Sequence, residues 1–188
     1  MDDDTTIDDT ATVEELREQI SALESQVEEL QDQEEGPTEM VIIATKGTLD
    51  MAYPVLILGP MAAAFGWNVT VFATFWGLDM LHEENHENLQ LSAVGNPSMP
   101  LPNLLAVMPG MDRLTTKMMR DKIDEVGTDS VPELVQRGLE NGVNFQACQM
   151  TMDLMDYDDE EFIDGVETGV GAAHALRQMA DSDVQLLV

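Results

Sequence analysis

A long uncharged stretch sets the strongest limit on how this chain can fold. Residues 51–78 carry no charged side chain, so they must be buried either in a lipid bilayer or in a protein core. Gly59 and Gly66 interrupt the stretch, and residues 69–71 form a β-branched run that favours a strand. Its far end is followed by Asp79, and neither Lys nor Arg flanks it. We therefore expect a buried helix followed by a buried strand, and no membrane span.

The neighbouring segments place this helix and strand in a larger pattern. Residues 40–45, MVIIAT, read as a buried parallel strand, residues 49–66 as a helix, and residues 68–75 as a second strand. This order indicates a βαβ unit, and we expect a three-layer α/β domain with a mostly parallel sheet. Further strands are expected at 143–148, at 184–188 and within 89–107, and further helices at 113–124, 130–141 and 158–180. Residues 78–88 are expected to be a short helix running into an acidic loop, and residues 149–155 a short turn or helix.

The chain before this domain divides into two parts. Residues 1–10 are acidic and polar, and we expect them to be disordered. Residues 11–36 are expected to form a coiled-coil-like helix and a Gly-Pro linker, followed by the α/β domain over residues 37–188. This helix either packs on its own domain or joins copies of the chain. Its apolar residues alternate in spacings of three and four, as in a coiled-coil seam: Val13, Leu16, Ile20, Leu23, Val27 and Leu30.

Acidic residues dominate the whole chain, whose formal net charge is -29. Residues 1–39 hold 15 acids and one base, and residues 40–188 hold 22 acids and 7 bases, which gives -14 and -15. Such a charge excludes nucleic acid as a partner, because phosphate binding needs a cationic surface. We interpret it as the mark of a proteome adapted to high salt. The acidic start is unlike a secretory signal peptide, and we expect a cytoplasmic protein.

Cys148 is the only cysteine, and it is our candidate for a reactive group. A single cysteine excludes an internal disulfide and a Cys-x-x-Cys redox pair. Cys148 ends a predicted strand, and ligands of open α/β sheets bind beyond the carboxyl ends of strands. The N–H groups of the helical segment that follows would favour a thiolate. The alternative is a buried structural cysteine.

His82 and His86 stand in the pattern His-Glu-x-x-His, which can bind zinc when it lies on a helix. The rest of such a site is missing, since Leu89 and Ser92 occupy the positions where a longer zinc motif has glycine and histidine. A Glu between two His also arises easily by chance in so acidic a chain. We therefore reject a metal at this segment, expect a solvated loop, and expect no cofactor.

Two further patterns have packing interpretations. Gly165 and Gly169 are expected to lie on one face of a helix that is pressed against the sheet or another subunit. Methionines gather in residues 97–122 and 150–155, either as core filling or, in the first segment, as a mobile lid over an apolar pocket at Cys148. We expect the thiol to be reachable beneath residues 97–122.

Four segments carry a resemblance to a known family: MVIIATKGTLDMAYPVLILGPMAAAFGWNVTVFATFWGLDML, LPNLLAVMPGMDRLTTKMM, GVNFQACQMTMDLM and FIDGVETGVGAAHAL. Together they resemble the DsrE/DsrF/DsrH family, in the branch often labelled DsrE-like or peroxiredoxin-family. The resemblance covers about residues 40–188. It implies a flavodoxin-like or Rossmann-like sheet of about five strands, and homo-oligomers that are often trimers or hexamers. It also implies a role in sulfur relay, with persulfide sulfur carried on Cys148 between a donor and an acceptor.

Two classes of function therefore remain open. In the first, a sulfur carrier or sulfurtransferase, the Cys148 thiolate attacks a donor persulfide and later yields the sulfur. In the second, a non-catalytic oligomeric binding or assembly protein, Cys148 is merely packed. A carrier cysteine should alkylate readily at neutral pH, and a packed one should not. The residues expected to line the carrier site are Lys46, Gly47, Thr48, Phe75, Trp76, Gln149 and Met150.

Overall fold

A computed structural model of the chain describes residues 9–33, 36–92 and 111–188, which fall into two compact units, 1–37 and 38–188. The first unit contains the helix α1 (Asp9–Gln33). Residues 9 and 10 are therefore helical and not disordered as expected, and the rest of the acidic start lies outside the described residues. The seam side chains from Val13 to Val27 are about half exposed, so nothing within this unit covers them.

The second unit is built on a five-stranded, wholly parallel sheet with the strand order β4-β3-β2-β1-β5. This confirms the predicted α/β class. The βαβ unit is formed as expected, with β1 and β2 paired in register from Glu39 and Asn68 to Ala44 and Ala73. The strands are β1 (Glu39–Ala44), β2 (Asn68–Ala73), β3 (Asn144–Cys148), β4 (Glu167–Val170) and β5 (Val184–Leu187).

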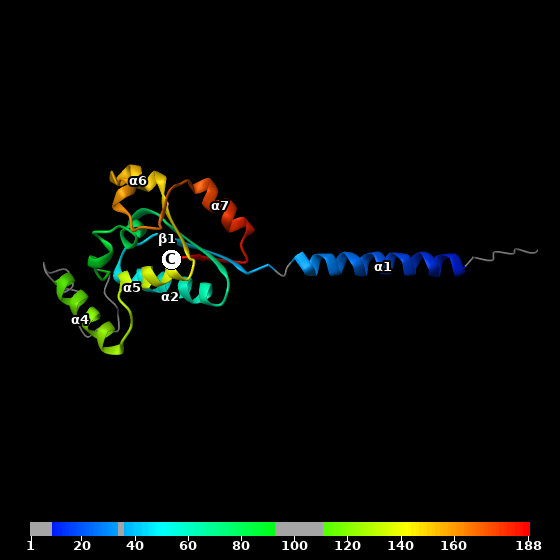
Figure 1. The fold of residues 1–188 in the computed structure, drawn as a ribbon, viewed down its shortest axis with the longest axis horizontal. Helices are drawn as coiled ribbons and strands as arrows, with labels where there is room; N and C mark the ends of the chain where they lie inside the picture. The colour runs from blue at the N-terminus through cyan, green and yellow to red at the C-terminus, as the bar shows by residue number, and fades with distance from the viewer. Residues whose placement is uncertain (1–8, 34–35, 93–110) are drawn as a thin grey trace, which may run out of the picture. The chain divides into compact units, whose positions relative to one another are not determined.

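Helices lie on both sides of this sheet, with α2, α4 and α5 on one side and α6 and α7 on the other (Figure 1). The α5 helix begins where the sequence indicated, because Ser130 and Glu133 form a capping box there. The α-helices are α2 (Leu49–Ala64), α4 (Met111–Val126), α5 (Val131–Glu140), α6 (Gln149–Met155) and α7 (Ala172–Asp181), and the 3-10 helices are η1 (Phe75–Met80), η2 (His86–Asn88) and η3 (Asp159–Glu161).

The two faces of the sheet are buried to very different extents. Alternate strand residues such as Ile42, Val71 and Phe145 face α2 and α5, and they belong to one large hydrophobic core. On the opposite face the clustered apolar core is small and has Ile43 packed against it: Phe72, Cys148, Val170 and Ala175. Apolar burial drives folding roughly in proportion to area, so most of the stabilisation comes from the α2 side.

The uncharged stretch is divided among α2, β2 and the start of η1, so the predicted helix and strand are both present. The strand is buried as expected, but only one face of α2 is buried, and Ile57, Leu58 and Met61 are 44–53% exposed. Leu56 in α2 and Val71 in β2 are completely buried. Within the described ranges, no helix is both long and apolar enough to cross a membrane.

The predicted helix over residues 158–180 is wrong. This segment forms η3, then the strand β4, and only then the helix α7. Gly165 and Gly169 have φ angles of +97° and +76°, which no right-handed helix contains. They are turn and strand positions and not a helix face. The strand expected within 89–107 is also wrong for residues 89–92, which are irregular, and residues 93–107 lie outside the described ranges.

The predicted helix and solvated loop over residues 78–88 need a similar correction. The segment contains the end of η1 and the short η2, with His82 between them. His82 is only 4% exposed, and its ring lies 4.7 Å from that of Tyr157 and 5.8 Å from that of Phe162. A backbone bridge to Phe162 holds the segment against the residue that follows η3. His82 is therefore a core residue packed in an aromatic cluster.

Candidate functional site

Cys148 occupies the position that the sequence indicated, at the carboxyl end of β3. It is also the N-cap residue of α6, with an extended backbone. The expectation that its thiol is reachable is not met in this conformation, because Cys148 is 2% exposed. The thiol is packed with Phe72 of β2, Val170 of β4 and Ala175 of α7.

The cover over Cys148 is thin. Two of its buried neighbours belong to the adjacent strands, and the third, Ala175, is the one buried residue of α7. The next residue, Leu176, is 65% exposed. A ten-residue helix that buries one alanine completely, and Gln178 and Met179 only in part, gains little from packing. Of the elements in this cluster, α7 is therefore the one that can leave Cys148 at the smallest cost in free energy.

Gln146 adds a polar group to the same face of the sheet. It lies two residues before Cys148 on β3, so both side chains point to one face. Gln146 is completely buried, and its Nε2 donates to Glu167 Oε2 at 2.9 Å. Its Oε1 has no hydrogen-bond partner among the described residues. A buried acceptor without a donor is costly, and a donor atom brought to this face would relieve that cost.

A strained turn joins the end of β2 to the helix that follows Cys148. Phe75 has a φ of +49°, which is unusual for a bulky residue. Its N–H donates to Thr151 Oγ1 at 3.2 Å, and the Thr74 and Thr151 hydroxyl oxygens lie 3.1 Å apart. Thr151 lies in the first turn of α6 and is buried. The turn leaves the Trp76 side chain 62% exposed at the carboxyl edge of the sheet.

A cavity of about 340 Å³ opens beside Trp76. It brings together three of the residues predicted to line the site, Gly47, Thr48 and Trp76. Among the described residues, Cys148 does not line this cavity. Lys46 and Met150 are exposed. The other lining residues of the cavity are Asp79, Asn85, Asn88, Leu89, Gln90 and Tyr157. The predicted site is thus divided between a buried thiol and a cavity that the thiol does not line.

Gln149, also predicted to line the site, is engaged on its own helix. Its Nε2 donates to Asp153 Oδ1 at 2.7 Å, one turn further along α6. Its Oε1 faces Gly169, where an added Cβ would lie 3.3 Å away. Gln149 therefore packs α6 against β4, and the prediction that it contacts transferred sulfur stays untested.

The cavity contains an ordered carboxylate that sequence reasoning missed. Asp79 Oδ1 accepts hydrogen bonds from Asn85 Nδ2 at 2.9 Å and from the Tyr157 hydroxyl at 3.2 Å. Burial, followed by the negative charge of Asp79, raises the pKa of Tyr157, so its hydroxyl stays protonated as a donor at neutral pH. The sequence did hold a signal, because Asp79 is the first charge after the uncharged stretch.

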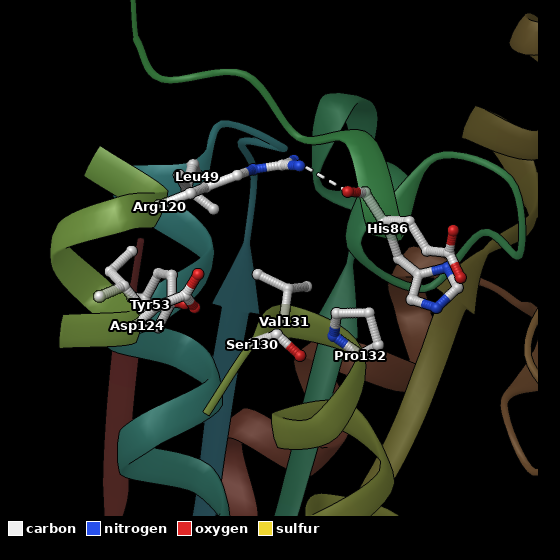
Figure 2. Close-up of a pocket in the computed structure, with 10 residues that line it drawn as sticks. Leu49, Tyr53, His86, Arg120, Asp124, Ser130, Val131 and Pro132 are labelled. Atoms are coloured by element: carbon white, nitrogen blue, oxygen red, sulfur yellow. Dashed lines mark hydrogen bonds between the residues drawn. The ribbon is translucent and has the colours of Figure 1, made fainter. Parts of the chain in front are cut away.

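A second cavity, of about 330 Å³, lies among α2, α4, α5 and η2 (Figure 2). Arg120 of α4 crosses its rim, and Arg120 Nη2 donates to the carbonyl oxygens of Glu87 at 2.8 Å and Leu89 at 3.2 Å. Met119 and Ile123 of α4 pack against the large core. The described part of the proposed methionine lid therefore covers the α2 side and not Cys148, and residues 97–110 lie outside the described ranges.

Both histidines of the His-Glu-x-x-His pattern have their Nδ1 atom in a hydrogen bond within the chain. The backbone N–H of Glu84 donates to His82 Nδ1 at 3.2 Å, and His82 Nε2 lies 3.9 Å from Glu161 Oε1. His86 Nδ1 lies 2.9 Å from the His82 carbonyl oxygen. In the part of the chain that the structure covers, no group of three or more His, Cys, Asp or Glu is arranged to hold a metal ion.

Fold and site together define an α/β protein with a single cysteine at the carboxyl edge of a parallel sheet. Residues 37–187 match the DsrE/DsrF/DrsH-like family. The chain is 43% identical over 158 residues to the sulfur carrier protein DsrE2 of Allochromatium vinosum, covering 80% of this chain and 98% of that protein. The chain therefore belongs to the DsrE/DsrF/DrsH-like family.

The chain is also similar to two more distant proteins. The chain is 28% identical over 155 residues to the uncharacterised protein YrkE of Bacillus subtilis, covering 78% of this chain and 94% of that protein. The crystal structure of the ychN protein from E. coli superposes with a TM-score of 0.50 at 12% identity, covering 80% of this chain and 99% of that chain. At that identity the likeness concerns the fold alone.

Proposed function

We propose that this protein is a sulfur carrier that relays persulfide sulfur through Cys148. The observation that carries the proposal is the position of the single cysteine, which ends β3 and caps α6 at the carboxyl edge of the sheet. The relative from Allochromatium vinosum, with 43% identity, is named a sulfur carrier protein, which supports the same role. The partners are then a sulfur donor and a sulfur acceptor, either proteins or small persulfides.

The proposed transfer is an exchange of thiolates at sulfur. The Cys148 thiolate attacks the outer sulfur of a donor persulfide, the S–S bond of the donor breaks, and its electron pair leaves with the donor thiolate. A persulfide now stands on Cys148, and the net oxidation state is unchanged. Attack by an acceptor thiolate on the outer sulfur reverses the process and regenerates Cys148. Both steps require that Cys148 leaves its buried position.

Mass spectrometry of the whole protein tests this proposal. Protein incubated with a small-molecule persulfide should gain about 32 Da, one sulfur atom, and should lose it again on treatment with a thiol reductant. The variant Cys148→Ser should fold as the wild type does and gain nothing. Equal mass gains in the two proteins, or none in the wild type after long incubation, would show that Cys148 carries no sulfur.

The alternative, a non-catalytic assembly protein, is favoured by two observations. Cys148 is buried, and the apolar seam of α1 is about half exposed in the single chain. We propose that α1 joins copies of this protein, whichever function Cys148 has. Removing residues 1–36 should leave the second unit folded. It should lower the number of chains per particle, which light scattering at equal protein concentration measures.

Point variants of α1 keep the chain intact in the same experiment. The double change Ile20→Ser and Leu23→Ser alters the seam and should act like the deletion, whereas Gln19→Ser, which lies outside the seam, should not. An oligomeric state that none of these changes alters would remove the assembly role from α1.

We also propose that the acidic surface is an adaptation to high salt. The acidic side chains, which give a net charge of -29, repel one another, and salt screens this repulsion over about 10 Å at 0.1 M and about 3 Å at 1 M. The midpoint of thermal unfolding should therefore rise steeply between 0.1 and 2 M KCl, as circular dichroism can follow. A midpoint independent of KCl would contradict this interpretation.

A further inference from the structure

The cavity beside Trp76 is built by a close approach of two backbone segments. A Cβ added at Gly47 would lie 2.1 Å from the Trp76 carbonyl oxygen and 2.8 Å from Asp79 Cβ, so only glycine allows this contact. The cavity lies beyond the carboxyl ends of β1 and β2, where open α/β sheets bind ligands. Its volume of about 340 Å³ is within the range of small-molecule sites.

The polar groups in this cavity are mainly acceptors. Asp79 Oδ1 is held by Asn85 and Tyr157, which fixes the carboxylate and leaves Oδ2 without a hydrogen bond in the described chain. Thr48 Oγ1 is buried and also has no partner among the described residues. A carboxylate oxygen and a hydroxyl without partners at one cavity match a ligand that donates several hydrogen bonds.

Trp76 adds an aromatic surface to these acceptors. Its side chain is 62% exposed, and it is held at the rim by the strained turn at Phe75. Backbone strain in a bulky residue is kept where the surrounding structure enforces it, often at binding sites. A tryptophan ring beside a carboxylate attracts a cation through both its π face and the negative charge.

We propose that this cavity binds a primary ammonium group on a short alkyl chain. Such a group has three donors, which Asp79 Oδ2 and Thr48 Oγ1 can accept, and its positive charge suits Asp79 and the ring of Trp76. The N-terminus of α2 opposes a cation with about half a unit charge, which is less than the full charge of the carboxylate. Its first N–H is moreover engaged, because Leu49 donates to the Gln90 carbonyl oxygen at 2.8 Å. The proposal does not depend on the sulfur chemistry of Cys148.

Fluorescence tests the proposal directly, because Trp76 is one of only two tryptophans. In a Trp67→Phe background, Trp76 alone reports on the cavity. Propylammonium chloride, propanol and potassium propionate have nearly the same shape and differ in charge. At matched ionic strength, only propylammonium should give a saturable change in emission. Equal responses to the three probes, or a response to propionate alone, would overturn the proposal.

Variants connect the signal to the proposed atoms. Asp79→Asn should weaken propylammonium binding at least tenfold, on the order expected for loss of a charged hydrogen bond. Asp121→Asn, which makes the same charge change on the exposed face of α4, should not. Thr48→Val should weaken binding about fivefold, and it serves as a second test if Asp79→Asn alters the circular dichroism spectrum. Unchanged binding in a folded Asp79→Asn or Thr48→Val variant would refute the assignment.

A last comparison distinguishes the possible sources of the ammonium group. Free propylammonium stands for a small-molecule ligand, and N-acetyl-lysine amide stands for a lysine side chain on a partner protein. Tighter binding of the lysine probe identifies a docking contact, and tighter binding of the free amine identifies a small-molecule site. If neither binds, the cavity has no affinity for ammonium groups and the proposal fails.

Discussion

Replacing Gly77 by alanine is expected to remove most of the stability of the second unit. The added Cβ would lie 2.2 Å from the Ala44 carbonyl oxygen and 2.8 Å from its carbonyl carbon. Both are backbone atoms at the end of β1, which is paired with β2 at this position and cannot shift alone. The free energy of unfolding should fall by more than about 4 kcal/mol, out of a total of about 5–15 kcal/mol for a domain.

Urea unfolding followed by circular dichroism measures this loss. Gly36→Ala is the matched control, because nothing lies within 4 Å of a Cβ at that position. The Gly36→Ala protein should unfold at the wild-type urea concentration, and the Gly77→Ala protein far below it. Similar midpoints for the two variants would mean that β1 and η1 can separate without cost. The cavity beside Trp76 would then lack the rigid wall on which its ligand geometry depends.

The parts of the fold that sequence predicted correctly are those set by local patterns. The uncharged stretch and its breaks located α2 and β2, because a buried parallel strand reads as a continuous apolar run and the glycines mark where the elements end. The same run did not indicate that one apolar face of α2 is exposed. The capping box at Ser130 located the start of α5 in the same way. Cys148 was correctly placed at a strand end, since the apolar run before it stops there.

The errors concern features that depend on distant contacts. The segment that forms β4 contains residues compatible with a helix, and it becomes a strand because β3 offers a free edge for pairing. The burial of Cys148 depends on β2, β4 and α7, and α7 begins 24 residues later in the chain. His82 is likewise followed by a polar run, residues 83–88, and its ring packs against Tyr157 and Phe162. No local pattern carries such information.

The second large effect that we expect concerns access to Cys148, which we predict to require the opening of α7. The neighbouring strands are fixed by pairing, and α6 is tied to the end of β2 through Thr151. The α7 helix contributes only Ala175 to the cover. Elements with few buried contacts open locally at a lower free energy than the whole domain unfolds. A thiol reagent should therefore reach Cys148 at a rate set by the open population of α7.

Two substitutions in α7 should change that rate in opposite directions without touching the thiol. Arg177→Gly places a glycine inside the exposed face of the helix, which should raise the open population and the alkylation rate about fivefold. Gly171→Ser improves the N-cap at a position where φ is −82° and nothing lies within 4 Å of a Cβ. It should lower the rate about threefold.

Lys117→Gly is the control for a lost cation and an added glycine, because it makes the same kind of change on the exposed face of α4, on the other side of the sheet. Alkylation by iodoacetamide, followed as mass gained with time, gives all four rates. If Lys117→Gly accelerates labelling as much as Arg177→Gly does, the thiol is reached by unfolding of the whole unit. A sulfur carrier could not work at that rate, because its cysteine would be available only in the unfolded chain.

If α7 alone controls the rate, a partner that draws α7 away can expose Cys148 while the sheet stays intact. Such an opening reconciles a buried thiol with sulfur transfer.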